Sequence, residues 1–237
     1  VKTARDFGLG NITGIDVPGE KKGIIPDPDW KKEKTKNTWF RGDTILLSIG
    51  QGYTLVTPIQ LAKAYTFLAN RGWAYEPHVV SKIEDLQTGK TEIVTTKKAI
   101  AEDYPESYYE TINDALIATV DQNNGTTKTM RNPYVKVAAK SGSAQNPHSK
   151  LTHAWVAGYF PADKEPEIVF VCLLEGAGGG GVKAGGMAKR FLDKYLEIEK
   201  GIEPVKKPPH VGSKITNSTI QTSGNQENES SGEGIGE

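Results

Sequence analysis

Residues 137–145 read Val-Ala-Ala-Lys-Ser-Gly-Ser-Ala-Gln and join an apolar segment to a short polar one. Before the polar part, the apolar residues Val135, Val137 and Ala139 recur at every second position. A period of two residues is typical of a strand with one buried face, so the pattern predicts a strand over about residues 134–141. We expect this strand to deliver its polar end to a rim of a sheet.

The polar part combines groups that suit a substrate with a carboxylate. Lys140 supplies a positive charge, Ser141 supplies a hydroxyl donor, and the backbone N–H of Ser143 can act as an oxyanion donor. Gly142 has no side chain, so a second backbone can lie against the strand and pair with it, as an extended peptide pairs with a sheet edge. The same letters also occur in ordinary edge strands, so the rest of the chain has to decide between the two interpretations.

Several other short segments agree with the first interpretation through their order along the chain. They are Phe7-Gly8-Leu9-Gly10, Thr13-Gly14-Ile15-Asp16-Val17-Pro18-Gly19-Glu20, Gly42-Asp43-Thr44, Ser48-Ile49-Gly50-Gln51-Gly52-Tyr53, Thr57-Pro58-Ile59-Gln60, His153-Ala154-Trp155 and the glycine run before the last expected helix. Together with Lys140-Ser141-Gly142, they resemble the transpeptidase domain of class B penicillin-binding proteins, especially those of the penicillin-binding protein 2 type. The resemblance covers residues 5–200.

The resemblance implies an α/β fold of the penicillin-binding protein and serine β-lactamase type, an antiparallel sheet flanked by helices that is incomplete in this chain. It also implies a peptidoglycan D,D-transpeptidase, which acylates a serine with a stem peptide ending in D-Ala-D-Ala and passes the acyl group to an amine. β-Lactams mimic that substrate. By resemblance, Lys140 and Ser143 are catalytic, with Lys140 organising charge and protons and the Ser143 amide forming half of the oxyanion hole. Ser141 binds the substrate carboxylate, and Gly142 admits the acyl chain beside the strand.

The surroundings of the whole protein follow from the same resemblance. We expect a bacterial protein of the cell envelope, anchored in the cytoplasmic membrane with this domain on the outer side. A membrane glycosyltransferase of the elongation machinery is the expected protein partner. No cofactor is implied.

The nucleophile that the family requires is missing from the chain. No serine is followed by a lysine three residues later, and Thr95-Thr96-Lys97-Lys98 reads as a solvated strand end. Ser223-Gly224-Asn225 matches the family's Ser-x-Asn element only in letters, because it follows Lys140 and lies in a polar tail. We therefore expect the chain to be the C-terminal part of a longer enzyme, inactive alone. The alternative is a non-catalytic homologue that binds β-lactams or regulates cell-wall partners, and upstream sequence would separate the two.

Composition excludes several other classes of protein. The 29 basic and 29 acidic residues cancel, so nucleic acid is not an expected partner. The single cysteine, Cys172, cannot form an internal disulfide and reads as a small buried apolar residue, and the four histidines show no metal-binding spacing. We therefore expect no metal. No apolar run approaches the roughly 20 residues that span a bilayer.

Residue patterns predict the other elements around the strand. We expect a loop-rich segment over 1–56, a helix from Thr57 to just before Gly72, a hairpin of 79–83 and 91–94, a helix over 107–122, strands over 152–160 and 166–175, and a helix over 185–199. Short turns between the three strands favour an antiparallel meander. Residues 201–237 are rich in Pro, Gly, Ser and Asn, which predicts a disordered polar tail after a domain spanning 1–200.

The run Gly176-Ala177-Gly178-Gly179-Gly180-Gly181 offers a different function. It follows an apolar strand and precedes a helix, as the phosphate-binding loop of a dinucleotide-binding unit does. No second parallel strand follows that helix, so a flexible strand-to-helix connection is the favoured interpretation and a nucleotide-binding module the weaker one.

Overall fold

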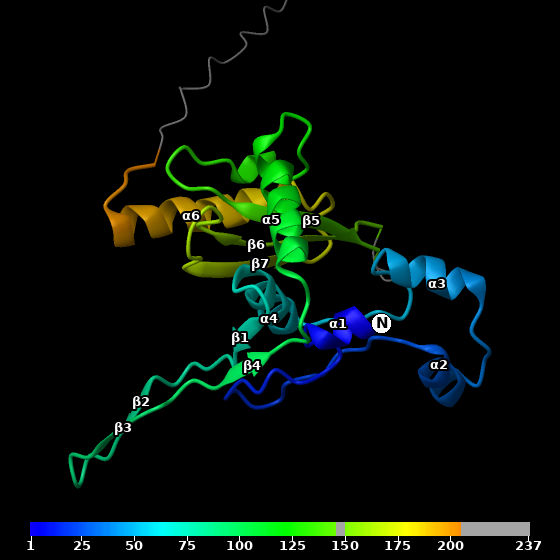
Figure 1. Cartoon of the computed structure of the whole chain (residues 1–237), viewed down its shortest axis with the longest axis horizontal. Helices are drawn as coiled ribbons and strands as arrows, with labels where there is room; N and C mark the ends of the chain where they lie inside the picture. The colour runs from blue at the N-terminus through cyan, green and yellow to red at the C-terminus, as the bar shows by residue number, and fades with distance from the viewer. Residues whose placement is uncertain (146–149, 205–237) are drawn as a thin grey trace, which may run out of the picture. The chain divides into compact units, whose positions relative to one another are not determined.

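A three-stranded antiparallel sheet lies at the centre of the computed structural model (Figure 1), which describes residues 1–145 and 150–204. Its strands are β5 (Ala138–Ala144), β6 (His153–Phe160) and β7 (Ile168–Leu174), in the order β5-β6-β7. The predicted meander is confirmed. The predicted start of the first strand is wrong, because pairing with β6 begins at Ala138. The polar triplet Lys140-Ser141-Gly142 therefore lies in the middle of β5, which is an outer strand of the sheet. The predicted tail lies outside the described residues, apart from 201–204.

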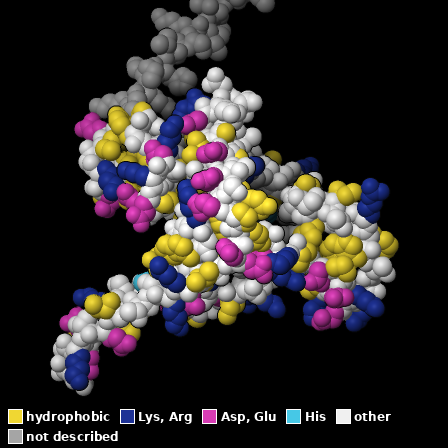
Figure 2. Space-filling model, in the orientation of Figure 1, with side chains coloured by type: hydrophobic (Ala, Val, Ile, Leu, Met, Phe, Trp, Pro, Cys, Tyr) yellow, Lys and Arg dark blue, Asp and Glu magenta, His cyan; other side chains and the backbone are white. Residues whose placement is uncertain are grey.

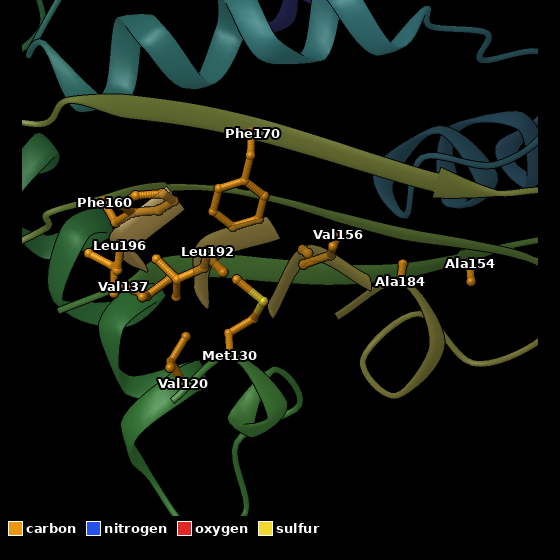
Figure 3. Packing of buried hydrophobic residues seen from close by; sticks show 12 residues of the cluster. Val120, Met130, Val137, Ala154, Val156, Phe160, Phe170, Ala184, Leu192 and Leu196 are labelled. Carbon is orange, nitrogen blue, oxygen red and sulfur yellow. The ribbon is translucent and has the colours of Figure 1, made fainter. Parts of the chain in front are cut away.

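Helices cover both faces of this sheet. On one face, helix α6 (Lys183–Lys200) packs on a core that also receives the 3₁₀ turn Lys128–Met130, and Figure 3 shows Phe160, Phe170, Leu192 and Leu196 converging there. On the other face, α4 (Pro58–Ala69) and α5 (Glu106–Asp121) bury Ala138 and Tyr159. Because side chains alternate along a strand, Ala138 and Ala139 point to opposite layers.

Helix α4 begins where the sequence predicts. Thr57 caps it by accepting a hydrogen bond from the N–H of Gln60, and the Gln60 side chain accepts one from the N–H of Thr57. This reciprocal capping box satisfies two donors at the helix start. The Gln60 amide, which is fully buried, also donates to the carbonyls of Asn11 and Lys22. It therefore fixes the preceding segment against the helix.

Most of residues 1–56 lies in turns and loops, as predicted, but the segment also has regular structure that the sequence did not predict. The segment contains three short helices, α1 (Lys2–Asp6), α2 (Pro28–Thr35) and α3 (Arg41–Ser48). These helices were difficult to recognise from the sequence because they are short and are separated by segments that contain proline and glycine. The buried Lys31 ammonium joins two of them, since it donates to the Asp43 carboxylate at 2.6 Å.

Apolar side chains remain exposed on and around α3. Figure 2 shows hydrophobic atoms gathered in this part of the molecule, and the exposed residues are Phe40, Ile45, Leu46, Ile49, Tyr53 and Leu55. A face of this kind is typical of an interface rather than of a surface in permanent contact with water.

Between α4 and α5 the chain forms two antiparallel strand pairs. Strand β1 (Trp73–Tyr75) pairs with β4 (Lys98–Ile100), and β2 (Lys82–Glu84) pairs with β3 (Thr91–Ile93). The predicted hairpin is confirmed in shorter form, and the pair at its base was not predicted. The Asp16 carboxylate accepts hydrogen bonds from the N–H groups of Val79 and Val80 near that base.

The apolar spacing of the sequence predicts two packing faces: Tyr108, Ile112, Leu116 and Val120 on the helix at 107–122, and Met187, Phe191, Leu192, Tyr195 and Leu196 on the last helix. Both predictions are only partly correct. On α6 the buried residues are Ala184, Gly185, Ala188, Leu192 and Leu196, whereas Met187 and Phe191 are exposed. On α5, Leu116 and Val120 are buried and Tyr108 and Ile112 are exposed. On α6, small residues take much of the buried face, whereas on α5 the buried face is formed by Tyr109, Leu116 and Val120.

Candidate active-site edge

The outer edge of β5 presents every second carbonyl to groups that lie outside the sheet. The Thr119 hydroxyl donates to the carbonyl of Ala139, the Lys140 ammonium donates to that of Ser141 at 2.6 Å, and the Gln51 amide lies 3.5 Å from that of Ser143. A strand that pairs on one side projects the backbone groups of alternate residues to its free side. The three acceptors therefore mark residues 139, 141 and 143 as the outward-facing set.

This geometry settles the direction of the backbone N–H groups. The N–H and C=O of one strand residue project to the same side, so Ser141 and Ser143 also turn their N–H groups to the free edge. Gly142 faces the other way, opposite Trp155 in the register with β6. The Ser143 N–H thus points away from β6, to the outer side of β5.

The side chains of the four predicted site residues divide between the two faces of the sheet. Ser141 and Ser143 share the face of Ala139, which is the α6 layer. Lys140 and Gly142 share the face of Ala138, which is the layer of α4 and α5. The Lys140 side chain is exposed and bends to the edge, where its ammonium lies beside the outward groups of Ser141.

Gly142 is not required by packing inside this chain. A Cβ added there would lie 3.6 Å from the Cβ of Trp155, which is an ordinary van der Waals distance, and the backbone has no left-handed conformation. Any steric demand for glycine at this position therefore comes from a group beyond the described residues.

The glycine run before α6 packs over this part of β5. The N–H of Gly180 donates to the Ser143 hydroxyl at 3.3 Å, and a Cβ on Gly180 would lie 2.2 Å from the carbonyl oxygen of Gly142. A Cβ on Gly181 would lie 1.9 Å from the carbonyl oxygen of Thr126. The chain's own backbone thus fills the space at these glycines. The sheet before this run is antiparallel, whereas a dinucleotide-binding unit has parallel strands joined through a helix, so the described residues do not favour that alternative.

Strand β6 holds the other end of the glycine run. The Thr152 hydroxyl donates to the carbonyl of Gly178, the N–H of Gly178 donates to the carbonyl of Thr152, and the N–H of Gly176 donates to Nδ1 of His153. His153 lies at the start of β6, opposite Ala144 in the register with β5. The run is therefore a strand-to-helix connection, as predicted, with hydrogen bonds near both of its ends, and its flexibility stays a prediction.

Threonines support the start of β5. The hydroxyl of Thr119 lies 2.6 Å from that of Thr127, which is fully buried, and the N–H of Thr127 donates to the carbonyl of Thr119. Thr129 continues the support by donating its hydroxyl to the carbonyl of Gly181. These contacts tie α5, the following turn and the glycine run to one strand.

Sequence reasoning placed Lys140 and Ser141 at the end of the predicted strand, whereas β5 continues through Gly142 and Ser143 to Ala144. It gave no role to Thr119 or Trp155, and it quoted Gln51 only as part of a family segment. Contacts across the sheet or from distant helices leave no local pattern in a sequence. Thr95 is exposed and Lys98 lies over the Trp73 ring, which agrees with the solvated strand end, and Ser223 lies outside the described residues.

Other features of the described residues do not compete with this edge. Cavities of about 500 and 660 Å³ are lined by the ends of α4 and α5 with the β6–β7 turn and by residues around 131–136, and neither is lined by β5. No cluster of metal-ligating side chains occurs in residues 1–145 and 150–204. Over the same ranges, no helix has both the length and the hydropathy to cross a membrane. Cys172 is half-buried, and this burial raises the pKa of its thiol.

Comparisons with known proteins point to one family. The family model described as "Penicillin binding protein transpeptidase domain" matches residues 1–193. The peptidoglycan D,D-transpeptidase MrdA of Haemophilus influenzae is 35% identical over 228 residues, which cover 85% of this chain and 34% of the relative. MrdA of Escherichia coli strain K12 is 34% identical over 206 residues, covering 80% of this chain and 32% of the relative. The chain thus spans about a third of the length of these curated relatives.

Solved structures agree with the sequence relatives. Pseudomonas aeruginosa PBP2 in complex with WCK 5153 superposes with a TM-score of 0.69 at 29% identity, over 85% of this chain and 44% of that one. The complex between PBP2 and MreC from Helicobacter pylori gives a TM-score of 0.69 at 26% identity, and the match covers 83% of this chain and 35% of that one. A peptidoglycan synthase complex that coordinates polymerization and crosslinking gives a TM-score of 0.68 at 29% identity, and the match covers 86% of this chain and 33% of that one. The predicted fold class is therefore confirmed, and the chain belongs to the transpeptidase domain family of class B penicillin-binding proteins.

Proposed function

We propose that this chain supplies the substrate-binding strand of a peptidoglycan D,D-transpeptidase, whose nucleophilic serine comes from sequence outside the chain. The observation that carries the proposal is the free edge of β5, where the outward N–H of Ser143 follows the Lys140 ammonium. The curated relatives named as D,D-transpeptidases support it. The same edge fits a β-lactam.

The proposed reaction proceeds in two steps. The serine hydroxyl gives up its proton as its oxygen attacks the carbonyl carbon of the penultimate D-Ala, and the oxyanion accepts hydrogen bonds from the Ser143 N–H and a second amide. The C–N bond to the terminal D-Ala then breaks, and that D-Ala leaves as an amine that takes up a proton. An acceptor amine on a neighbouring stem peptide then attacks the acyl-serine, loses its proton and releases the serine. Lys140 stabilises negative charge and assists these proton movements, and the Ser141 hydroxyl binds the terminal carboxylate.

The setting of the whole protein is part of the proposal. Relatives found with MreC and in a peptidoglycan synthase complex support a membrane glycosyltransferase of the elongation machinery as partner. The domain then acts in the bacterial cell envelope, on the outer side of the cytoplasmic membrane. A non-catalytic β-lactam-binding homologue is the alternative, and covalent labelling distinguishes it.

The test compares the 237-residue chain with the whole protein that contains it. Each is incubated with a fluorescent penicillin, denatured and analysed for covalent label, and the labelled residue is identified by peptide mass spectrometry. We expect stoichiometric label on a serine upstream of Val1 in the whole protein and none on the short chain. Reversible binding without covalent label would favour the non-catalytic homologue, and label within residues 1–237 would contradict the assignment.

A further inference from the structure

The Gln51 side chain reaches the part of β5 that a substrate has to use. Its amide nitrogen lies 3.5 Å from the carbonyl oxygen of Ser143, although the two residues are 92 positions apart in the sequence. That carbonyl and the Ser143 N–H form the outward pair with which an extended peptide would add to the edge. In the free protein, therefore, one of the two backbone groups needed for such pairing already has a donor beside it.

The backbone conformation of the turn after α3 places Gln51 near Ser143. The N–H of Gln51 donates to the carbonyl of Leu46 and thereby ends helix α3, and Gly50 and Gly52 on either side have φ angles of +72° and +73°. These left-handed conformations favour glycine and turn the chain back towards the sheet. The position is further fixed because the Trp30 and Tyr53 rings lie 5.3 Å apart, which ties the turn to α2.

The contact itself is weak. A distance of 3.5 Å is longer than the usual 2.7–3.2 Å range of N–H···O hydrogen bonds, and Ser143 is exposed to water. Thr119, by contrast, holds the Ala139 carbonyl in a region that α5 covers. The carbonyl of Ala139 is thus covered by packed residues and keeps its partner. The carbonyl of Ser143 is accessible, so another hydrogen-bond donor can replace the Gln51 amide there.

We propose that Gln51 is a positioning residue whose side-chain amide occupies the outward carbonyl of Ser143 in the free enzyme and is displaced by the backbone N–H of the acyl donor. The amide satisfies the exposed edge between turnovers and protects it from pairing with other strands. A ligand that offers an N–H at this place has to displace the Gln51 donor, while a ligand without the N–H leaves the Gln51 contact intact.

The experiment uses the whole protein with Gln51→Met, which keeps the length of the side chain and removes the donor. Gln87→Met is the matched control, because Gln87 is exposed at the tip of the β2–β3 hairpin. Stopped-flow acylation separates the dissociation constant of the noncovalent complex from the acylation rate constant. The two ligands are benzylpenicillin, which carries an acylamino N–H beside the lactam, and penicillanic acid, which lacks the acylamino group.

We expect Gln51→Met to lower the dissociation constant for benzylpenicillin about two- to fivefold, the equivalent of one weak hydrogen bond. The constant for penicillanic acid and the acylation rate constants should stay within experimental error of the Gln87→Met control. Equal effects on both ligands, or no effect on either, would overturn the inference. The proposal rests on the proposed function, yet the two fail separately: an unmodified protein that neither ligand acylates contradicts the function, whereas normal acylation with an unchanged Gln51→Met profile contradicts only the role of Gln51.

Discussion

The Thr119 hydroxyl on α5 donates to the carbonyl of Ala139, one residue before Lys140 on the edge strand. The same hydroxyl lies 2.6 Å from that of the fully buried Thr127. Helix α5 is thus hydrogen-bonded directly to β5, the strand that carries the candidate site. This contact is at Ala139, immediately before the site residues begin at Lys140.

Replacing Thr119 by Val should lower the free energy of unfolding by about 1–3 kcal/mol, because the Ala139 carbonyl and the Thr127 hydroxyl lose a partner in a region that excludes water. Denaturant titration of the whole protein measures the change. Thr119→Ser keeps the hydroxyl and should retain most of the stability. Equal stability of the Val variant and the unmodified protein would show that the contact contributes nothing.

The Lys140 ammonium and the Ser141 hydroxyl can be tested in the whole protein. Ser141→Ala should reduce the second-order rate constant of penicillin acylation about ten- to a hundredfold, because a charge-assisted hydrogen bond to the carboxylate is lost. Ser141→Thr should have a mild effect, and Lys140→Ala should lower the rate at least as much as Ser141→Ala. Lys194→Ala, an exposed change on α6, serves as the control. Unchanged acylation in both Ala variants would remove these residues from the site.

In the glycine run, alanine substitutions at the neighbouring positions Gly179 and Gly180 should have different effects on stability. Gly180→Ala should cost about 1–3 kcal/mol of stability or more, because the new Cβ would lie 2.2 Å from the carbonyl oxygen of Gly142 and force two backbone segments apart. Gly179→Ala should be tolerated, since nothing lies within 4 Å of its added Cβ and its φ angle is not left-handed. Thermal unfolding of the two variants is the measurement. Similar losses in both would mean that the loop resists any side chain and that the close approach to β5 is not the cause.

Acid should weaken the contact between α2 and α3. The Lys31 ammonium and the N–H of Phe40 lower the pKa of the Asp43 carboxyl below its usual value. An unfolded aspartate has a pKa of about 3.9, so between the two values the unfolded chain binds more protons and stability rises with pH. The contribution of Asp43 is complete above the unfolded pKa and is lost as pH falls through the folded one.

Unfolding measured from pH 5 downward should therefore show a steeper loss for the unmodified protein than for Asp43→Asn. At neutral pH, Asp43→Asn leaves the buried Lys31 charge without its partner and should be destabilising, whereas adding Lys31→Met should recover part of the loss. Identical pH profiles for the unmodified protein and Asp43→Asn would contradict the lowered pKa.

The start of α4 and the topology of the three-stranded sheet were predictable because their signals are local. Thr57 and Gln60 stand at the spacing of a capping box, and the three strands are joined by short turns. The start of β5 was not predictable from its period, since Tyr134 and Val135 alternate with their neighbours and yet find no partner strand. The face of α6 was misjudged because small residues, not Met187 and Phe191, allow the closest approach to the sheet.

The candidate site shows the same division between local and distant information. The identities of Lys140 to Ser143 were evident from the sequence and from the resemblance to a known family. The direction in which each backbone group points was not, because it depends on which residue pairs with which on β6. The contact of Gln51 with Ser143 arises from two segments that meet only in the folded chain.

The pairing of Gly142 with Trp155 gives the protein a spectroscopic reporter of its own. The chain has four tryptophans, and Trp155 alone stands opposite the site strand, while Trp30, Trp39 and Trp73 lie elsewhere. Its Cβ is 3.6 Å from the point where a side chain at Gly142 would begin, so a molecule that covers Gly142 on this face of the sheet should change the polarity around the indole ring. With the other three tryptophans replaced by phenylalanine, the emission of Trp155 can follow occupation of the strand in real time, before any covalent bond forms and without a labelled antibiotic.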